Sequence, residues 1–396
     1  MNILIAAASF SSNMSGLQRH ALNVARCLML EPEITTVHLV IAPWQRGLVQ
    51  SAGFLDNPRV VTHVAEMDRT SISRNLWYYR QLPKLASQLQ ADLVHLSYPM
   101  PVHASAFTCP TIVTLHDLYP YEIPMNFGFP KFIFNRLVLQ QCLRNIDAIA
   151  CVSQITHARL RQYLPSSVSQ KAVRIYNCVE AQLVSNAQPP NPRWYGQRFL
   201  LTVAQHRRNK NLPLLIRTFH RMLRNGQIAP EMKLMIIGIA GPETPRIRQL
   251  VSSLNLDGIV AFLEGVPDSE LQWCYAHCEA VVSPSTVEGF GLPIAEALLA
   301  GCRIVCSDIP AFREVAQGQC RFVSLKRNAD EKLAAAIVDT LAEPKQLPRS
   351  LPQFSAPVLA GQYTSLYRRL IASSTPFQKR RLTAPINSPA SERQPF

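Results

Sequence analysis

Short apolar runs alternate with amphipathic stretches along the first part of the chain, a pattern typical of successive βαβ units around a parallel sheet. Between these runs, Leu17, Ala21, Val24 and Leu28 recur at the spacing of one helix face. The strands that the pattern predicts span residues 2–7, 37–41, 93–96, 111–115 and 148–152. This series predicts a first α/β domain over residues 1–185.

A proline-rich break then interrupts the series. Pro189, Pro190 and Pro192 lie close together, which indicates a linker over residues 186–198. The strands predicted beyond this break span residues 199–203, 233–237, 259–263, 280–283 and 303–307. We therefore expect a second α/β domain over residues 199–355, doubly wound like the first.

The C-terminal residues divide into a predicted helix and a tail. Residues 356–372 place their apolar side chains on one helix face, namely Leu359, Tyr363, Leu366, Tyr367 and Leu370. Residues 373–396 are rich in Pro and Ser and include the basic residues Lys379, Arg380, Arg381 and Arg393. We expect this tail to be disordered, because it has little apolar surface to bury.

The composition is that of a soluble globular protein, with 47% of 396 residues hydrophobic and 17% charged. No apolar run reaches the roughly 18 to 20 residues that a membrane-spanning helix requires. The apolar residues 3–8 predict a buried strand and not a signal peptide, because no Lys or Arg precedes them. The ten cysteines form no CxxC pair, which favours reduced thiols and a cytoplasmic protein.

The formal net charge of +14 is compatible with three kinds of partner: nucleic acid, an anionic membrane surface or a phosphate-bearing substrate. Residues 283–301 favour the last of these. A buried strand ends at Ser283, a glycine-bearing loop follows, and a helix begins near Pro293 and stops at Gly301. Backbone N–H groups and a helix N-terminus at the end of a parallel strand form a phosphate site.

The same segment, SPSTVEGFGLPIAEALLAG, resembles the Glu-x7-Glu signature of retaining glycosyltransferases of the GT-B fold, especially glycosyltransferase family 4. The resemblance implies an α/β protein with two Rossmann-like domains facing across a cleft and a C-terminal helix crossing back to the first domain. It implies that Glu296 holds the ribose of a nucleotide-sugar donor and that Glu288 faces the sugar. The neighbouring residues that the resemblance places at the donor are Gly289, Phe290, Gly291 and Leu292, with Val266 at the nucleotide base.

Residues 204–211, AQHRRNKN, place several cations between the first strand of the second domain and its helix. Fixed cations there would stabilise the charge that develops on a departing diphosphate. Lys210 matches the family's diphosphate lysine, but Gln205 stands where relatives carry an arginine. Arg207 and Arg208 are the two candidates to replace it.

The first domain contributes two further candidates. His116 follows the predicted strand 111–115, whose carboxyl end faces the ligand crevice, and resembles the family residue that touches the donor sugar. Gly16 resembles a glycine of the turn where donor phosphate and acceptor meet, although Ser15 replaces a second glycine. The catalytic candidates are thus His116, Lys210 and Glu288.

The chemistry that the resemblance implies requires neither a cofactor nor a metal ion. No Asp-x-Asp pair lies beside the predicted sugar site, and the cationic loop supplies charge to the leaving group. Transfer would occur on the front face of the sugar, with the leaving diphosphate helping to deprotonate the acceptor hydroxyl.

Lipid-linked acceptors in related enzymes raise the alternative of peripheral attachment to the inner face of the cell membrane. Lys131, Arg136 and Arg144 flank apolar positions of one predicted helix. These apolar positions are Phe132, Ile133, Phe134, Leu137 and Leu139. Core packing explains the same pattern, so both interpretations stay open.

We therefore expect transfer of a hexose from a UDP- or GDP-sugar to a glycan or lipid-linked acceptor in polysaccharide or lipopolysaccharide biosynthesis, with no nucleic-acid partner. A nicotinamide enzyme is disfavoured because the first turn lacks G-x-G-x-x-G. The alternatives are a nucleotide-sugar epimerase or a phosphorylase on the same scaffold, and a non-catalytic nucleotide-sugar-binding homologue.

Overall fold

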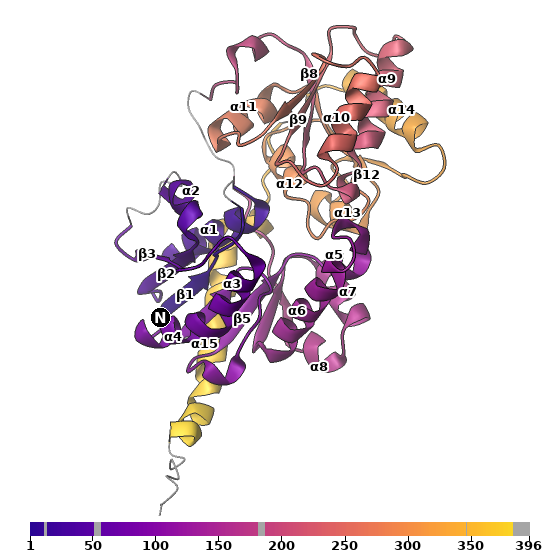
Figure 1. The fold of residues 1–396 in the computed structure, drawn as a ribbon. Helices are drawn as coiled ribbons and strands as arrows, with labels where there is room; N and C mark the ends of the chain where they lie inside the picture. The colour runs from indigo at the N-terminus through magenta and orange to yellow at the C-terminus, as the bar shows by residue number, and fades with distance from the viewer. Residues whose placement is uncertain (12–13, 51–56, 181–186, 346, 383–396) are drawn as a thin grey trace, which may run out of the picture.

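The chain forms two lobes, each built around a parallel sheet (Figure 1). The computed structural model describes residues 1–11, 14–50, 57–180, 187–345 and 347–382. The predicted boundary between residues 185 and 186 lies outside these ranges, and the limits of the linker and domains stay predictions.

The N-terminal lobe has a seven-stranded sheet in the order β3-β2-β1-β4-β5-β6-β7. Its strands are β1 (Asn2–Ala6), β2 (Thr36–Ile41), β3 (Val60–Val64), β4 (Leu93–Leu96), β5 (Thr111–Leu115), β6 (Ala148–Cys151) and β7 (Ala172–Arg174). Its α-helices are α1 (Gly16–Met29), α2 (Arg46–Gln50), α3 (Ser71–Leu76), α4 (Leu82–Gln88), α5 (Tyr119–Glu122), α6 (Lys131–Asn145), α7 (Gln154–Tyr163) and α8 (Ser166–Ser169).

The C-terminal lobe has a six-stranded sheet in the order β10-β9-β8-β11-β12-β13. Its strands are β8 (Phe199–Val203), β9 (Lys233–Ile237), β10 (Val260–Leu263), β11 (Ala280–Ser283), β12 (Ile304–Ser307) and β13 (Arg321–Val323). Its α-helices are α9 (Leu212–Arg224), α10 (Thr244–Ser253), α11 (Asp268–His277), α12 (Leu292–Leu299), α13 (Pro310–Ala316) and α14 (Ala329–Ala342).

Both sheets reverse their strand order at one point. In the N-terminal lobe the chain starts at β1, moves outward to β3 and returns to β4 on the other side of β1; β8 and β11 flank the equivalent point in the C-terminal lobe. The loops that leave the carboxyl ends of such a strand pair diverge and form the usual ligand crevice of open α/β sheets. The sites predicted at residues 204–211 and 283–301 both lie on loops of this kind.

The central strands form because their apolar runs are buried on both faces. All the residues of β4, β5 and β12 are buried, as expected for parallel strands that helices cover on both sides. The strand pattern missed β3, β7 and β13, which are short or partly exposed and therefore lack a continuous apolar run.

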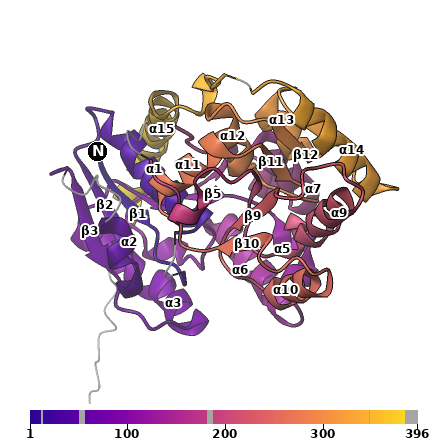
Figure 2. The same cartoon turned by 90° about the horizontal axis from the view of Figure 1, so that it is seen from above.

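The last helix, α15 (Ala356–Leu382), crosses back and packs beside α1 of the N-terminal lobe (Figures 1 and 2). Leu359, Tyr363 and Tyr367 of this helix join the core formed by residues of α1, β1 and β2. The crossover is therefore confirmed, but its predicted end at residue 372 was wrong. Once the first turns are docked, each further residue adds to an existing helix at little cost, and the helix continues to Leu382. Residues 383–396 lie outside the described ranges.

A buried polar chain fixes α15 to the sheet. The Tyr367 hydroxyl donates to His95 Nδ1 (2.6 Å), and His95 Nε2 donates to Thr114 Oγ1 (2.8 Å). The Thr114 hydroxyl donates to His20 Nε2 (3.1 Å), and His20 Nδ1 donates to the side-chain oxygen Oδ1 of Asn177 (2.8 Å). One direction of donation satisfies every group with neutral histidines.

None of the helices within the described ranges combines the length and the apolar composition needed to cross a membrane.

Candidate active site between the lobes

Lys210 and Glu288 form the centre of the candidate site. Lys210 ends the short 3-10 turn Arg208–Lys210 after β8, and Glu288 lies in the loop after β11. The Lys210 ammonium nitrogen is 2.5 Å from Glu288 Oε1, and the exposed fractions of the two side chains are 18% and 8%. The adjoining backbones are also joined, because Thr286 N–H donates to the Asn209 carbonyl oxygen (2.8 Å). The two predicted loops therefore form one unit.

Glu296 lies one turn into α12 and is separate from this pair. Its Oε2 accepts a hydrogen bond from the Tyr275 hydroxyl at 2.7 Å. Burial raises the pKa of Glu296, while the nearby Arg19 guanidinium and the Tyr275 hydroxyl oppose that rise. Arg19 belongs to α1 and is 2.5 Å from Asp268 Oδ1, so the start of α1 faces Glu296 from the other lobe.

Gly16, the first residue of α1, lies close to the same place. A methyl group added at Gly16 would lie 4.0 Å from Leu292 Cδ1, at the start of α12. Ser15 caps the helix by accepting from Gln18 N–H, and the Gln18 side chain accepts from Ser15 N–H. Ser15 therefore has a structural use of its own at the position where relatives have a second glycine.

The two predicted glycine positions in the loop after β11 require glycine for different physical reasons. A Cβ atom on Gly289 would lie 1.8 Å from the His116 carbonyl oxygen, so only glycine permits this approach of the two lobes. Gly291 precedes α12 with a φ of 109°, a left-handed conformation that favours glycine. Phe290, between them, is buried in the core and has ring contacts with Tyr176 and Phe354.

His116 follows β5 and reaches the interface between the lobes. Its Nε2 donates to the Ser97 carbonyl oxygen at 2.9 Å, which leaves Nδ1 of the neutral ring as an acceptor. Burial lowers the pKa of His116 to about 4, against a smaller opposing effect of the hydrogen bond to Ser97. A neutral acceptor nitrogen is suited to a sugar hydroxyl.

The cations after β8 differ in placement. Arg207 is partly buried, and its Nε donates to Gln205 Oε1 at 2.7 Å, whereas Arg208 is exposed. Burial raises the pKa of the partly buried Asp117 carboxyl group, and the positive charge of Arg207 opposes that rise, so Arg207 lies near the lobe interface. Of the two candidates, Arg207 is the one whose charge, like that of Lys210, acts on Asp117. Val266 is partly buried against the core of the C-terminal lobe.

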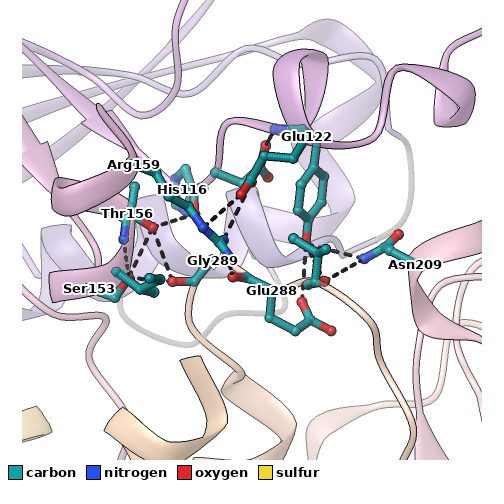
Figure 3. Close-up of polar contacts among 12 residues, drawn as sticks. His116, Glu122, Ser153, Thr156, Arg159, Asn209, Glu288 and Gly289 are labelled. Carbon is teal, nitrogen blue, oxygen red and sulfur yellow. Dashed lines mark hydrogen bonds and ion pairs between the residues drawn. The ribbon is translucent and has the colours of Figure 1, made fainter. Parts of the chain in front are cut away.

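Polar contacts close the two lobes around the β11 loop (Figure 3). The Gly289 carbonyl oxygen accepts from the Ser153 hydroxyl (2.5 Å) and the Thr156 hydroxyl (3.1 Å) of the N-terminal lobe. Arg159 Nη1 donates to the Glu288 carbonyl oxygen at 3.0 Å, while its Nε is 2.7 Å from Glu122 Oε1. The loop is thus held by its backbone from one lobe and by Lys210 from the other.

Several residues of this interface were missed in the sequence. The Tyr119 hydroxyl donates to Glu288 Oε2 at 3.1 Å and accepts from Asn209 Nδ2 at 3.3 Å. Asn126 Nδ2 donates to Asn209 Oδ1 at 3.0 Å, and this contact also joins the lobes. Asp117 carried a signal, since it adjoins His116 in the same motif, whereas no local pattern marked Tyr119 or Asn126.

Among the described residues, no group of three or more His, Cys, Asp and Glu side chains is arranged to hold a metal ion. The expectation of metal-independent chemistry stays a prediction.

Comparison with known proteins relates both lobes to carbohydrate chemistry. Residues 14–183 match the family model described as Glycosyltransferase Family 4, and residues 186–353 match that of Glycosyl transferases group 1. The chain is 22% identical to O-antigen chain mannosyltransferase B of Escherichia coli, over 87% of this chain and 91% of that protein. It is 25% identical to O-antigen chain mannosyltransferase RfbU of Salmonella typhimurium, over 61% of this chain and 63% of that protein.

The fold is shared with solved structures. HepE of Anabaena, crystallised with UDP and glucose, superposes with a TM-score of 0.60 and 17% identity over 97% of this chain and 99% of that chain. The two family matches together span both lobes, and the lobes have the predicted parallel sheets and crossover helix. The chain therefore belongs to the glycosyltransferases of group 1 and family 4 and has their GT-B fold.

Proposed function

We propose that this glycosyltransferase moves a hexose from a UDP- or GDP-linked sugar to a hydroxyl group of a glycan or lipid-linked glycan. One observation carries the proposal: the loops at the strand-order reversal join Lys210 and Glu288 in an ion pair, with Arg207 on the same loop as Lys210 and Glu296 one turn into α12. Lys210 and Arg207 suit a diphosphate, Glu288 suits the sugar, and Glu296 suits the two ribose hydroxyls.

The relatives support a place in polysaccharide or lipopolysaccharide biosynthesis. Two of them are O-antigen chain mannosyltransferases, so mannose is the first hexose to test. HepE binds UDP and glucose, which supports testing UDP-glucose beside GDP-mannose.

The proposed transfer retains the configuration at the anomeric carbon and uses no cofactor. The bond from that carbon to the diphosphate oxygen breaks, and the bond to the acceptor oxygen forms on the same face. The acceptor hydroxyl proton passes to a diphosphate oxygen. Lys210 and Arg207 stabilise the departing diphosphate, and His116 and Glu288 hold the sugar.

The test is a panel of UDP- and GDP-sugars, scored for hydrolysis and for transfer to glycan acceptors. Lys210→Ala should lower turnover by roughly 100-fold, the usual loss when one charge-stabilising group is removed. Glu296→Gln should weaken donor binding by about tenfold and lower turnover at limiting donor, because the ribose hydroxyls lose a charged acceptor. The matched controls Lys332→Ala and Glu331→Gln, both exposed on α14, should retain wild-type turnover.

The outcomes separate the alternatives. A change in the configuration of the nucleotide sugar without any acceptor would indicate an epimerase. Cleavage of a glycan that depends on phosphate would indicate a phosphorylase, and binding without turnover would indicate a non-catalytic homologue. If no nucleotide sugar binds the wild-type protein, the transferase proposal is wrong. If both site variants equal wild type, the residue assignment is wrong.

The proposal also places the enzyme on the cytoplasmic face of a membrane, through an apolar patch on the N-terminal lobe. Leu139 of α6 is buried in the core, but other apolar residues of α6 and the preceding segment are exposed. The patch consists of Met125, Phe129, Ile133, Phe134 and Leu137, with exposed fractions of 70%, 82%, 42%, 50% and 58%. Residues 123–146 carry three basic side chains and no acidic one, which suits an anionic bilayer.

The patch begins next to the site, because Asn126 contacts Asn209 beside Lys210. An acceptor carried by a membrane lipid would thus be presented near the donor. Co-sedimentation with phosphatidylglycerol vesicles should fall about tenfold or more in Phe129→Ser/Phe134→Ser, since each loses buried apolar area. Ile72→Ser/Leu347→Ser removes two apolar residues that are 80% and 82% exposed elsewhere, and should bind like wild type. Equal losses in both double variants would contradict the patch.

A further inference from the structure

Two carboxylate groups from opposite lobes converge on Tyr119. The Tyr119 backbone N–H donates to Asp117 Oδ1 at 3.0 Å, and its hydroxyl donates to Glu288 Oε2 at 3.1 Å. Asp117 and Tyr119 belong to the N-terminal lobe, whereas Glu288 comes from the C-terminal lobe. Closure of the lobes therefore assembles this group.

Asp117 is partly buried between the lobes and has no ion pair among the described residues. Within the described ranges its carboxylate accepts one hydrogen bond, through Oδ1. Burial raises the pKa of Asp117 to about 6, the charge of Glu288 adds to the rise, and Arg207 and Lys210 oppose it. The second oxygen, Oδ2, is left to accept a hydrogen bond from a ligand. A desolvated carboxylate is costly alone, and donors supplied by a ligand would relieve that cost.

Glu288 changes partners if a diphosphate binds at Lys210. The diphosphate oxygens would compete with Glu288 Oε1 for the Lys210 ammonium group, now 2.5 Å away. Tyr119 would still donate to Oε2, so the Glu288 side chain would stay in place with Oε1 open. A hexose ring offers hydroxyl donors, which carboxylates accept in strong, charge-assisted hydrogen bonds.

We propose that Asp117 completes the donor-sugar subsite from the N-terminal lobe, opposite Glu288, and that Tyr119 is a positioning residue that keeps Glu288 oriented when Lys210 turns to the diphosphate. The ligand class is a nucleoside diphosphate hexose with free hydroxyl groups for both carboxylates. The inference rests on the proposed function and assigns the specificity of its sugar subsite to these residues.

The test compares a nucleoside diphosphate with its sugar derivative, using calorimetry on the full-length chain. The probes are UDP against UDP-glucose and GDP against GDP-mannose. Asp117→Asn and Tyr119→Phe should weaken binding of the nucleotide sugar about tenfold, the loss of one hydrogen bond to a charged group, and change binding of the nucleotide by less than about twofold. A merely structural role would lower both affinities together.

Matched controls are Asp339→Asn on α14 and Tyr195→Phe, at residues outside this interface that are exposed to solvent. Both should bind nucleotide and nucleotide sugar as the wild type does. A second readout is the pH dependence of binding. In the wild type, the ratio of the affinity for the nucleotide sugar to the affinity for the nucleotide should increase as pH rises through about 6, where Asp117 becomes charged. Asp117→Asn should lack this increase.

The outcomes separate this inference from the proposed function. If the wild type binds neither nucleotide nor nucleotide sugar, the proposed function fails. The wild type can bind the nucleotide sugar more tightly than the nucleotide while Asp117→Asn has the same affinity ratio between the two ligands at every pH. In that case only the role of Asp117 in the sugar subsite is overturned. If Tyr119→Phe weakens both probes equally, its positioning role is overturned.

Discussion

Lys210 and Glu288 come from two loops of one lobe and hold each other at 2.5 Å, at the edge where the other lobe makes contact. The ion pair connects the group expected at the diphosphate with the group expected at the sugar.

Removal of Lys210 alone should destabilise the protein more than removal of the whole pair. Lys210→Ala leaves Glu288, whose side chain is 8% exposed, without its counter-ion, and we expect a loss of about 3 kcal/mol. The double variant Lys210→Ala/Glu288→Gln should recover part of this loss, because no buried charge remains. Urea unfolding of the wild type, both single variants and the double variant measures the difference. Equal destabilisation in Lys210→Ala and the double variant would contradict the buried-charge explanation.

A methyl group at Gly289 should prevent closure of the lobes. In Gly289→Ala the new Cβ would lie 1.8 Å from the His116 carbonyl oxygen, so the backbones must separate. We expect loss of transferase activity and a larger radius of gyration in small-angle X-ray scattering. Gly361→Ala on α15 is the control, because a Cβ there meets no atom within 4 Å. The prediction is wrong if Gly289→Ala is as compact and active as Gly361→Ala.

His95 should make folding sensitive to acid. Burial lowers its pKa in the folded state to about 3, below the ordinary value of 6.5, so the unfolded chain binds the proton first. Its contribution to stability is therefore complete above pH 6.5 and is lost as pH falls toward 3, by up to about 1.4 kcal/mol per pH unit. In His95→Gln, urea unfolding between pH 4 and 7 should show a stability that falls less steeply with acid than in the wild type. The prediction is wrong if the stability of His95→Gln and that of the wild type fall equally steeply with decreasing pH.

The effect of shortening α15 on stability should depend on whether the part of the helix that packs in the core is retained. A chain ending at residue 373 keeps Tyr363 and Tyr367 in the core and should unfold within about 0.5 kcal/mol of the full chain. A chain ending at residue 355 exposes that core and should be insoluble or bind a hydrophobic dye. Equal stability of the two truncated chains, measured by thermal unfolding, would show that α15 is not part of the core.

Much of the fold was predictable because buried strands are encoded by local runs of apolar residues. β4, β5, β8, β9 and β11 have the predicted limits, since each is a continuous apolar run between polar turns. The edge strands β3 and β13 were missed for the opposite reason: their pairing with a neighbour, and not their own burial, makes them strands.

The site divides in the same way. Lys210 lies in one continuous segment of the chain, and Glu288 and Glu296 lie in another. Each segment follows a predicted strand, so its motif and its place at the end of that strand could be recognised in the sequence. The contact between Tyr119 and Glu288 spans 169 positions along the chain and depends on how two separate lobes pack. Periodicity along the sequence does not reveal such a contact, which also explains why Asn126 and Arg159 were not predicted as site residues.

By itself, then, the amino-acid sequence determined most strands of both sheets, the C-terminal helix and the loops that end the β8 and β11 strands, because these depend on local pattern and burial. The family resemblance implied that this helix crosses back to the first lobe. Only the tertiary structure decided that Arg207 and not Arg208 turns to the interface, that Phe290 packs in the core, and that Tyr119 reaches Glu288. These outcomes depend on the packing of side chains between segments that are distant in sequence. Lys210 and Glu288 were predicted separately; their pairing arises where two loops of one sheet meet.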